Sequence, residues 1–198
     1  MKSKILPDFC LPGRPLQELG GVIIHYVSGK SDYDVDPFNL HVIRDQLVDL
    51  NCPQAQRKYY LREPKWPAER MFASCHALIG RFGEIWKLAE FDCETYHAGA
   101  SLLNGRPDCN RWTLGVELAG NRTSGFTEPQ YQALANLLTW LMLDKGLKRE
   151  NIAGHDVVRW AAIQAGLTTK RPKYDPSGRK DGLGKNFDWP LLDRLLAG

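Results

Sequence analysis

The run Gly21-Val22-Ile23-Ile24-His25-Tyr26 is the stretch that decides the fold. It is short, apolar and rich in β-branched residues, which is typical of a strand buried on both faces. We therefore predict a strand over residues 21–27, whose C-terminal end carries His25 and Tyr26. A lone histidine at a strand end is more often structural than a metal ligand, so His25 needs partners from elsewhere in the chain.

Such partners lie near the other end of the sequence. His155 follows the apolar run Ile152-Ala153, which predicts a second histidine at a strand end. Lys173 and Asp175 are two residues apart, and in an extended segment such residues point to the same side. A catalytic zinc takes three protein ligands and leaves a fourth position to water. His155 and Asp175 supply two ligands, and His25 is the candidate for the third.

The composition indicates one ordered, globular domain over residues 1–198, with 43% hydrophobic and 25% charged residues. The net charge of +3 suits an anionic substrate such as a cell-wall polymer, and it is too weak to indicate nucleic acid. Five cysteines without a C-x-x-C pair favour a reduced, intracellular chain. No signal peptide, membrane span or membrane insertion is expected, so we predict a protein that is cytoplasmic as synthesised and monomeric.

The remaining pattern mixes strands with helices, which predicts an α/β fold with a central mixed β-sheet flanked by helices. Glu117 lies within the predicted central strand, and a capping box with Thr127 and Gln130 predicts a helix that ends at Gly146. Further elements are an irregular lead-in (1–20), an expanded helix-plus-loop segment (28–70, helix 38–50), a hairpin (73–79 and 84–89), loops (96–99 and 100–111), the central strand (113–119) and two helices (157–165 and 187–196).

Seven short motifs occur in an order that resembles one family. They are G-V-I-I-H-Y at 21–26, S-C-H-A-L-I at 74–79, Y-H-A-G at 96–99, W-T-L-G-V-E-L-A-G at 112–120, F-T-E-P-Q-Y at 126–131, G-H at 154–155 and K-Y-D-P at 173–176. Over residues 20–190 the chain is similar to the zinc-dependent N-acetylmuramoyl-L-alanine amidases, whose fold includes muropeptide-recycling amidases, phage lysozyme-type amidases and peptidoglycan recognition proteins.

The resemblance implies one zinc ion per chain, held by His25, His155 and Asp175. It also implies that Glu117 is the carboxylate that moves protons and that Lys173 stabilises the oxyanion. Apolar neighbours should raise the pKa of Glu117, which suits this role. Substrate contacts are expected at His97, Tyr26, Gly99 and Asn110.

Several positions have a second interpretation. His97 suits a substrate contact slightly better than a ligand, whereas His76 is expected to be a buried, hydrogen-bonded residue. Cys75 occupies the position of a tyrosine in the phage branch, and both Cys75 and Cys93 are expected to be core thiols. The interval from His155 to Lys173 and the segment 28–70 are longer than is usual in the family.

The expected activity is hydrolysis of the amide between N-acetylmuramic acid and L-alanine of peptidoglycan. The longer 28–70 segment favours a phage or prophage-type lytic amidase, an endolysin, that acts on polymeric cell wall. The alternatives are a cytoplasmic recycling amidase for anhydro-muropeptides and a peptidoglycan-binding module without activity. Because Glu117 is present, the proton chemistry resembles that of the recycling branch.

Overall fold

A computed structural model of the chain describes residues 15–27, 75–120, 124–168, 183 and 186–198. The predicted ligand Asp175, the predicted catalytic Lys173 and the predicted helix 38–50 lie outside these residues. The same holds for the 28–70 segment and for most of the 1–20 lead-in.

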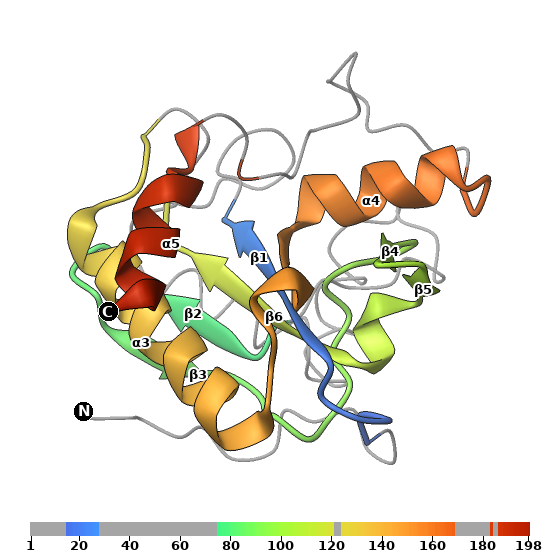
Figure 1. The fold of residues 1–198 in the computed structure, drawn as a ribbon, viewed down its shortest axis with the longest axis horizontal. Coiled ribbons are helices and arrows are strands. Elements are labelled where there is room, and N and C mark those ends of the chain that lie inside the picture. Colours follow the sequence, from blue (N-terminus) through green and yellow to red (C-terminus); the bar gives the residue numbers. More distant parts are fainter. Residues whose placement is uncertain (1–14, 28–74, 121–123, 169–182, 184–185) are drawn as a thin grey trace, which may run out of the picture.

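A five-stranded mixed sheet forms the centre of the fold (Figure 1). Four of its strands run parallel, and the strand at one edge is antiparallel to its neighbour. The central mixed sheet flanked by helices is thereby confirmed. In spatial order the strands are β3 (Ile85–Lys87), β2 (Ala77–Ile79), β6 (Thr113–Leu118), β1 (Gly21–Tyr26) and β7 (Ile152–Gly154).

The pairing of β1 with β6 places His25 beside Glu117, in the same register that places Ile23 beside Gly115. Successive side chains of a strand point to opposite faces of a sheet. His25, Glu117 and Gly115 therefore share one face. Val22, Ile24 and Tyr26 point to the other face. This alternation separates the hydrophobic core from the candidate site.

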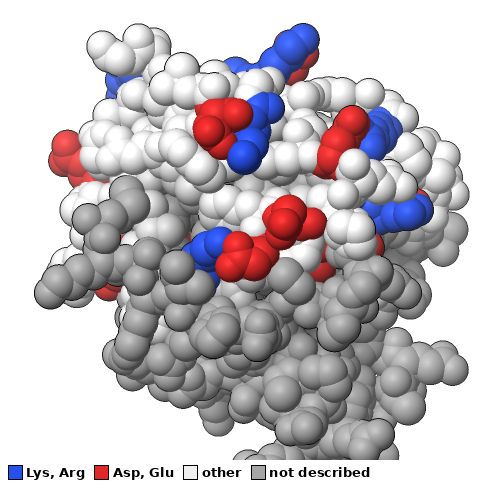
Figure 2. Space-filling model, turned by 90° about the horizontal axis from the view of Figure 1, so that it is seen from below, with Lys and Arg blue, Asp and Glu red and all other residues white. Residues whose placement is uncertain are grey.

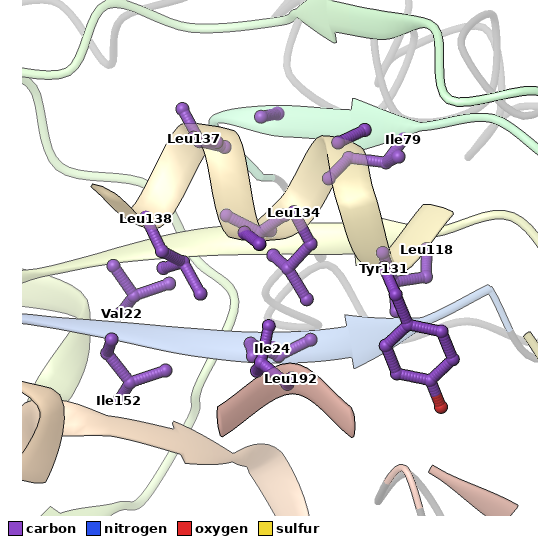
Figure 3. Packing of buried hydrophobic residues seen from close by; sticks show 14 of the residues in the cluster. Val22, Ile24, Ile79, Leu118, Tyr131, Leu134, Leu137, Leu138, Ile152 and Leu192 are labelled. Atoms are coloured by element: carbon purple, nitrogen blue, oxygen red, sulfur yellow. The ribbon is translucent and has the colours of Figure 1, made fainter. Parts of the chain in front are cut away.

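The core face is covered by two helices, α3 (Glu128–Lys145) and α5 (Trp189–Ala197). Figure 3 shows Leu134 and Leu138 of α3 above Val22 and Ile24 of β1, and all four are fully buried. Burying a side chain of this size contributes about 1.5–3 kcal/mol. The predicted C-terminal docking helix is thus confirmed as α5, which packs against α3.

Helix α3 begins and ends as its sequence predicts. The Thr127 hydroxyl accepts a hydrogen bond from the Gln130 amide, and the Gln130 side chain accepts one from the Thr127 amide. The Gln130 side chain also donates to the carbonyls of Ile79 and Ala119, which ties the helix to the sheet. At the other end Gly146 adopts φ 65°, a left-handed conformation that suits glycine.

The opposite face carries α4 (His155–Gln164) and a small hairpin of β4 (Leu102–Leu103) and β5 (Arg106–Pro107). We expected a loop over 100–111, so the hairpin is a correction. Its signal is the dipeptide Asn104-Gly105, whose φ angles of 50° and 79° form a turn that favours two-residue hairpins. Helix α4 starts two residues before the expected position 157, directly at the end of β7.

The cysteines differ from expectation at one position. Cys75 and Cys109 are free and buried, which confirms a core thiol at Cys75. Cys93 is disulfide-bonded, so the expectations of a core thiol and of a fully reduced chain are wrong here. Disulfide formation requires Cα atoms within about 7 Å of each other, a proximity that only the fold reveals.

Charges on the described surface are mixed. Figure 2 shows basic and acidic side chains lying side by side on one face, and the described residues of that face form no large patch of a single sign. Two ion pairs of the described residues, Arg149–Asp193 and Lys87–Glu90, join opposite charges on the surface. Within the described part of the chain, no helix is both long and apolar enough to cross a membrane.

Candidate active site

Two predicted metal ligands meet beside the carboxyl end of the parallel strands. His25 is the fifth residue of the six-residue strand β1, and His155 opens α4 directly after β7. Because β1 and β7 are hydrogen-bonded neighbours, the two imidazole rings lie 4.8 Å apart between centroids. The fold therefore brings together two side chains that are 130 positions apart in the sequence.

Each of these imidazoles has its Nε2 atom engaged by a protein group. His155 Nε2 lies 3.2 Å from the carbonyl oxygen of Ala98. A carbonyl only accepts, so this nitrogen carries a proton, and Nδ1 is the ring nitrogen left for a metal. His25 Nε2 lies 3.1 Å from Nδ1 of His97, which places a third imidazole directly beside the pair.

Burial keeps two of these rings neutral. It lowers the pKa of His25 well below 6.5, and the neighbouring His155 and His97 add to the effect. Burial likewise lowers the pKa of His97 well below 6.5, with a further contribution from His76. Metal ions bind the neutral imidazole, so this environment suits His25 for coordination.

Glu117 lies next to His25 on the same face of the sheet. The two residues are paired across β1 and β6, and Leu78 of β2 occupies the matching position on the other side of Glu117. Burial raises the pKa of the Cys75 thiol, and the charge of Glu117 adds a smaller effect in the same direction. A carboxylate beside a candidate ligand can exchange protons with a group held there.

Zinc fits the donors present. Among the described residues, no group of three or more His, Cys, Asp or Glu side chains is arranged to hold a metal ion. His97 cannot complete such a group with His25 and His155, since its two ring nitrogens bond to His25 and to Thr113. His25 and His155 are two of the three ligands that a catalytic zinc takes, and the predicted third ligand, Asp175, lies outside the described residues.

The predicted substrate contacts lie in different surroundings. His97 and Asn110 are buried, and Asn110 Oδ1 accepts hydrogen bonds from the amides of His97 and Ala98. Gly99 is exposed at the end of the same turn, with φ 55°. Tyr26 packs in the core under α3, on the face opposite His25, because adjacent residues of a strand point to opposite faces. A side-chain contact from Tyr26 to substrate has no support in this position.

His76 is fully buried and hydrogen-bonded, as predicted. Its Nδ1 accepts from the amide of Gly115 at 3.0 Å, and its Nε2 donates to the carbonyl of Cys93 at 2.8 Å. Sequence reasoning missed the role of Gly115 in this part of the site. A Cβ atom there would lie 2.5 Å from Cγ of His97, so glycine allows that ring to approach the strand.

Comparison with known proteins identifies the family of this chain. The profile of the N-acetylmuramoyl-L-alanine amidase family matches residues 16–178. The 1,6-anhydro-N-acetylmuramyl-L-alanine amidase AmpD of Salmonella typhimurium is 36% identical over 124 residues, which are 63% of this chain and 57% of that protein. The chain thus spans a little over half the length of this relative.

AmpD of Haemophilus influenzae is 33% identical over 174 residues, which cover 87% of this chain and 80% of that protein. Among solved structures, the crystal structure of a selenomethionine AmpD derivative is similar to this chain with a TM-score of 0.61 and 26% identity, covering 91% of this chain and 86% of that one. The family profile spans most of the sequence and the relatives share the fold, and we conclude that this chain belongs to the N-acetylmuramoyl-L-alanine amidase family.

Proposed function

We propose that this protein is a zinc amidase that cleaves the bond between N-acetylmuramic acid and L-alanine in soluble 1,6-anhydro-muropeptides. The similar proteins named above are 1,6-anhydro-N-acetylmuramyl-L-alanine amidases, which supports the recycling alternative over the endolysin that the sequence analysis favours. The argument for a lytic enzyme rested on the 28–70 segment, which lies outside the described residues. The recycling of soluble anhydro-muropeptides would place the enzyme in the cytoplasm.

The observation that carries the proposal is the meeting of His25, His155 and Glu117 on one face of the sheet. His25 and His155 would hold the metal together with Asp175. Zinc bound there would polarise the scissile carbonyl and lower the pKa of a water molecule toward about 7. Two imidazoles at the ends of neighbouring parallel strands are an arrangement that a structural role alone does not require.

Glu117 would take the proton of the attacking water and return it to the leaving nitrogen of L-alanine. Its register position beside His25 puts a carboxylate next to a proposed metal ligand, which supports this role. Proton transfer of this kind contributes about 10²–10⁴-fold to the rate. Lys173 would stabilise the oxyanion of the tetrahedral intermediate, a role commonly worth about 3 kcal/mol.

The substrate class is tested by giving the purified protein two substrates under the same conditions. Mass spectrometry should show anhydro-muropeptide converted to free peptide and anhydro-muramic acid, and the turbidity of purified sacculi should change little. Rapid loss of turbidity would replace the recycling role by the lytic one. Zinc binding and peptidoglycan binding without any cleavage would instead identify a binding module.

Substitutions test the residue roles. His155→Ala should lose both zinc and activity, since one ligand is removed. Glu117→Gln should keep zinc and its melting temperature while activity falls about 10²–10⁴-fold. Glu128→Gln is the matched control, because Glu128 lies exposed at the start of α3, on the opposite side of the sheet. A near-normal rate for Glu117→Gln at full zinc content would refute the proton-transfer role.

A further inference from the structure

We propose that His97 is a positioning residue, which holds His25 in the tautomer whose Nδ1 atom carries the lone pair for the metal. The inference rests on the proposed function, because it takes His25 to be a metal ligand. It assigns His97 a role that differs from the substrate contact predicted for it. The evidence is a chain of hydrogen bonds that runs from β6 through His97 to His25.

The first bond fixes the proton on Nε2 of His97. This nitrogen lies 3.2 Å from the main-chain carbonyl of Thr113 and 3.4 Å from the Thr113 hydroxyl. The carbonyl can only accept. The hydroxyl donates its single proton to the carbonyl of Cys109 at 2.7 Å, so it also presents an acceptor to His97. Both oxygen atoms therefore require an N–H at Nε2.

The second bond follows from the charge of the ring. His97 is 6% exposed and packs against His25 and His76, two further imidazoles, so a second ring proton would put a charge in a buried place, which is costly. A neutral imidazole has one proton, which is already on Nε2. Nδ1 of His97 is consequently an acceptor, and it faces Nε2 of His25 at 3.1 Å.

The third step assigns the tautomer of His25. Its Nε2 must donate to His97, so Nδ1 of His25 is left with the lone pair. The opposite tautomer of His25 would need a proton on Nδ1 of His97, and Nε2 of His97 would then turn a lone pair toward the carbonyl of Thr113. Two acceptors would face each other at 3.2 Å in a buried place, where an unmet hydrogen bond is costly.

The main chain holds His97 in place for this role. Asn110 Oδ1 accepts from the amide of His97 at 2.9 Å and from that of Ala98 at 2.7 Å, so the turn is fixed at two points. Gly115 lets the ring lie directly against β6, because any Cβ at this position would overlap His97. Ligand imidazoles are generally oriented through their second nitrogen in this way.

The direct test is nitrogen NMR of the metal-free wild-type protein labelled with ¹⁵N-histidine. His25 should show a protonated Nε2 and an unprotonated Nδ1. A scalar coupling across the hydrogen bond should connect Nε2 of His25 to Nδ1 of His97. A proton on Nδ1 of His25 would overturn the inference, and this measurement needs no variant.

Variants then separate positioning from packing. His97→Leu removes the acceptor, whereas His97→Asn can place an amide oxygen near the position of Nδ1. Zinc affinity, measured by calorimetry at constant pH, should fall about 10- to 100-fold in His97→Leu, and His97→Asn should recover part of the loss. A wild-type affinity in a folded His97→Leu protein would overturn the role. If His97→Leu does not fold, the NMR spectrum of the wild type and the zinc affinity of His97→Asn test the role of His97 instead.

Failure of the proposed function would look different. If wild-type protein binds no zinc and cleaves no muropeptide, the proposed function falls. If it binds zinc and cleaves substrate while His25 carries its proton on Nδ1, only the role of His97 falls.

Discussion

The buried imidazole of His76 should make the stability of this protein depend on pH in a way that one substitution removes. Burial lowers the pKa of His76 to about 4, from an ordinary value of 6.5. The contacts explain the direction, because Nδ1 accepts the amide proton of Gly115 and Nε2 already donates to the carbonyl of Cys93. A second ring proton would place two donors opposite each other and break the bond to β6.

The sign follows from proton counting. Below pH 6.5 the unfolded chain binds a proton at His76 that the folded chain does not bind, so stability falls as the pH is lowered toward 4. The full shift from 6.5 to about 4 corresponds to about 3 kcal/mol, at roughly 1.36 kcal/mol per pKa unit. By about pH 5 roughly 2 kcal/mol should be lost, and above pH 6.5 the contribution should be flat.

The measurement compares wild type with His76→Asn by urea unfolding between about pH 7.5 and pH 5. Both proteins are kept metal-free with a chelator, so that metal release at low pH does not enter. Near pH 7.5 the variant should be less stable by about 1–3 kcal/mol, because the carbonyl of Cys93 loses its donor. The difference in unfolding free energy between wild type and His76→Asn should shift by about 2 kcal/mol in favour of the variant at pH 5, since the variant has no proton to gain at this position.

His25 is also buried, but it is present in both proteins and its contribution cancels in the difference. His97 is present in both as well, and only the part of its pKa shift that comes from His76, which is smaller than the part from burial, differs between them. If the gap between wild type and His76→Asn stayed constant over this range with equal m-values, the buried neutral imidazole would not be the cause of the pH dependence.

Two further substitutions test the scaffold. Gly115→Ala should lower the free energy of unfolding by about 1–3 kcal/mol and also weaken zinc binding, since the new Cβ displaces His97. In the control Gly105→Ala, no atom lies within 4 Å of the new Cβ, so only the free energy of unfolding should fall, because of the positive φ. Equal zinc affinities in Gly115→Ala and Gly105→Ala would contradict the role of Gly115. Thr127→Ala removes the cap of α3 and should lower the free energy of unfolding by about 0.5–2 kcal/mol, measured with urea. Thr127→Ser keeps a hydroxyl and should recover most of this loss. An unchanged urea midpoint for Thr127→Ala would show that the cap is not needed.

The elements that the sequence predicts well are those whose signal is local. The capping residues Thr127 and Gln130 and the stop at Gly146 define α3, and the apolar run of β1 defines its strand. The hairpin at Asn104-Gly105 has a local turn signal too, but its two strands, of two residues each, are too short to be recognised in the sequence. Two residues on each side are too few to show an alternating pattern.

The site was predictable in part, for a different reason. His25, His155 and Glu117 are recognisable through the motif order, and the fold brings them together. What the sequence could not show is the function of His97 and Gly115, because both depend on contacts between segments that are far apart. A histidine in a loop and a glycine in a strand have many ordinary explanations until the distance between them is known.

The division of β1 and β6 into two faces explains how this fold tolerates so many buried polar groups. On the face toward α3 the side chains are apolar and supply the stability, whereas the other face carries neutral imidazoles with Thr113 and Asn110. Buried polar groups are costly only when their hydrogen bonds are unmet. Here both nitrogens of His76 and of His97 are bonded, so the network can be rigid at little cost. The face that carries the proposed ligand His25 is therefore held by hydrogen bonds of the protein itself, in the register that pairs His25 with Glu117. A slip of β1 by one residue would turn His25 from this face toward the apolar core.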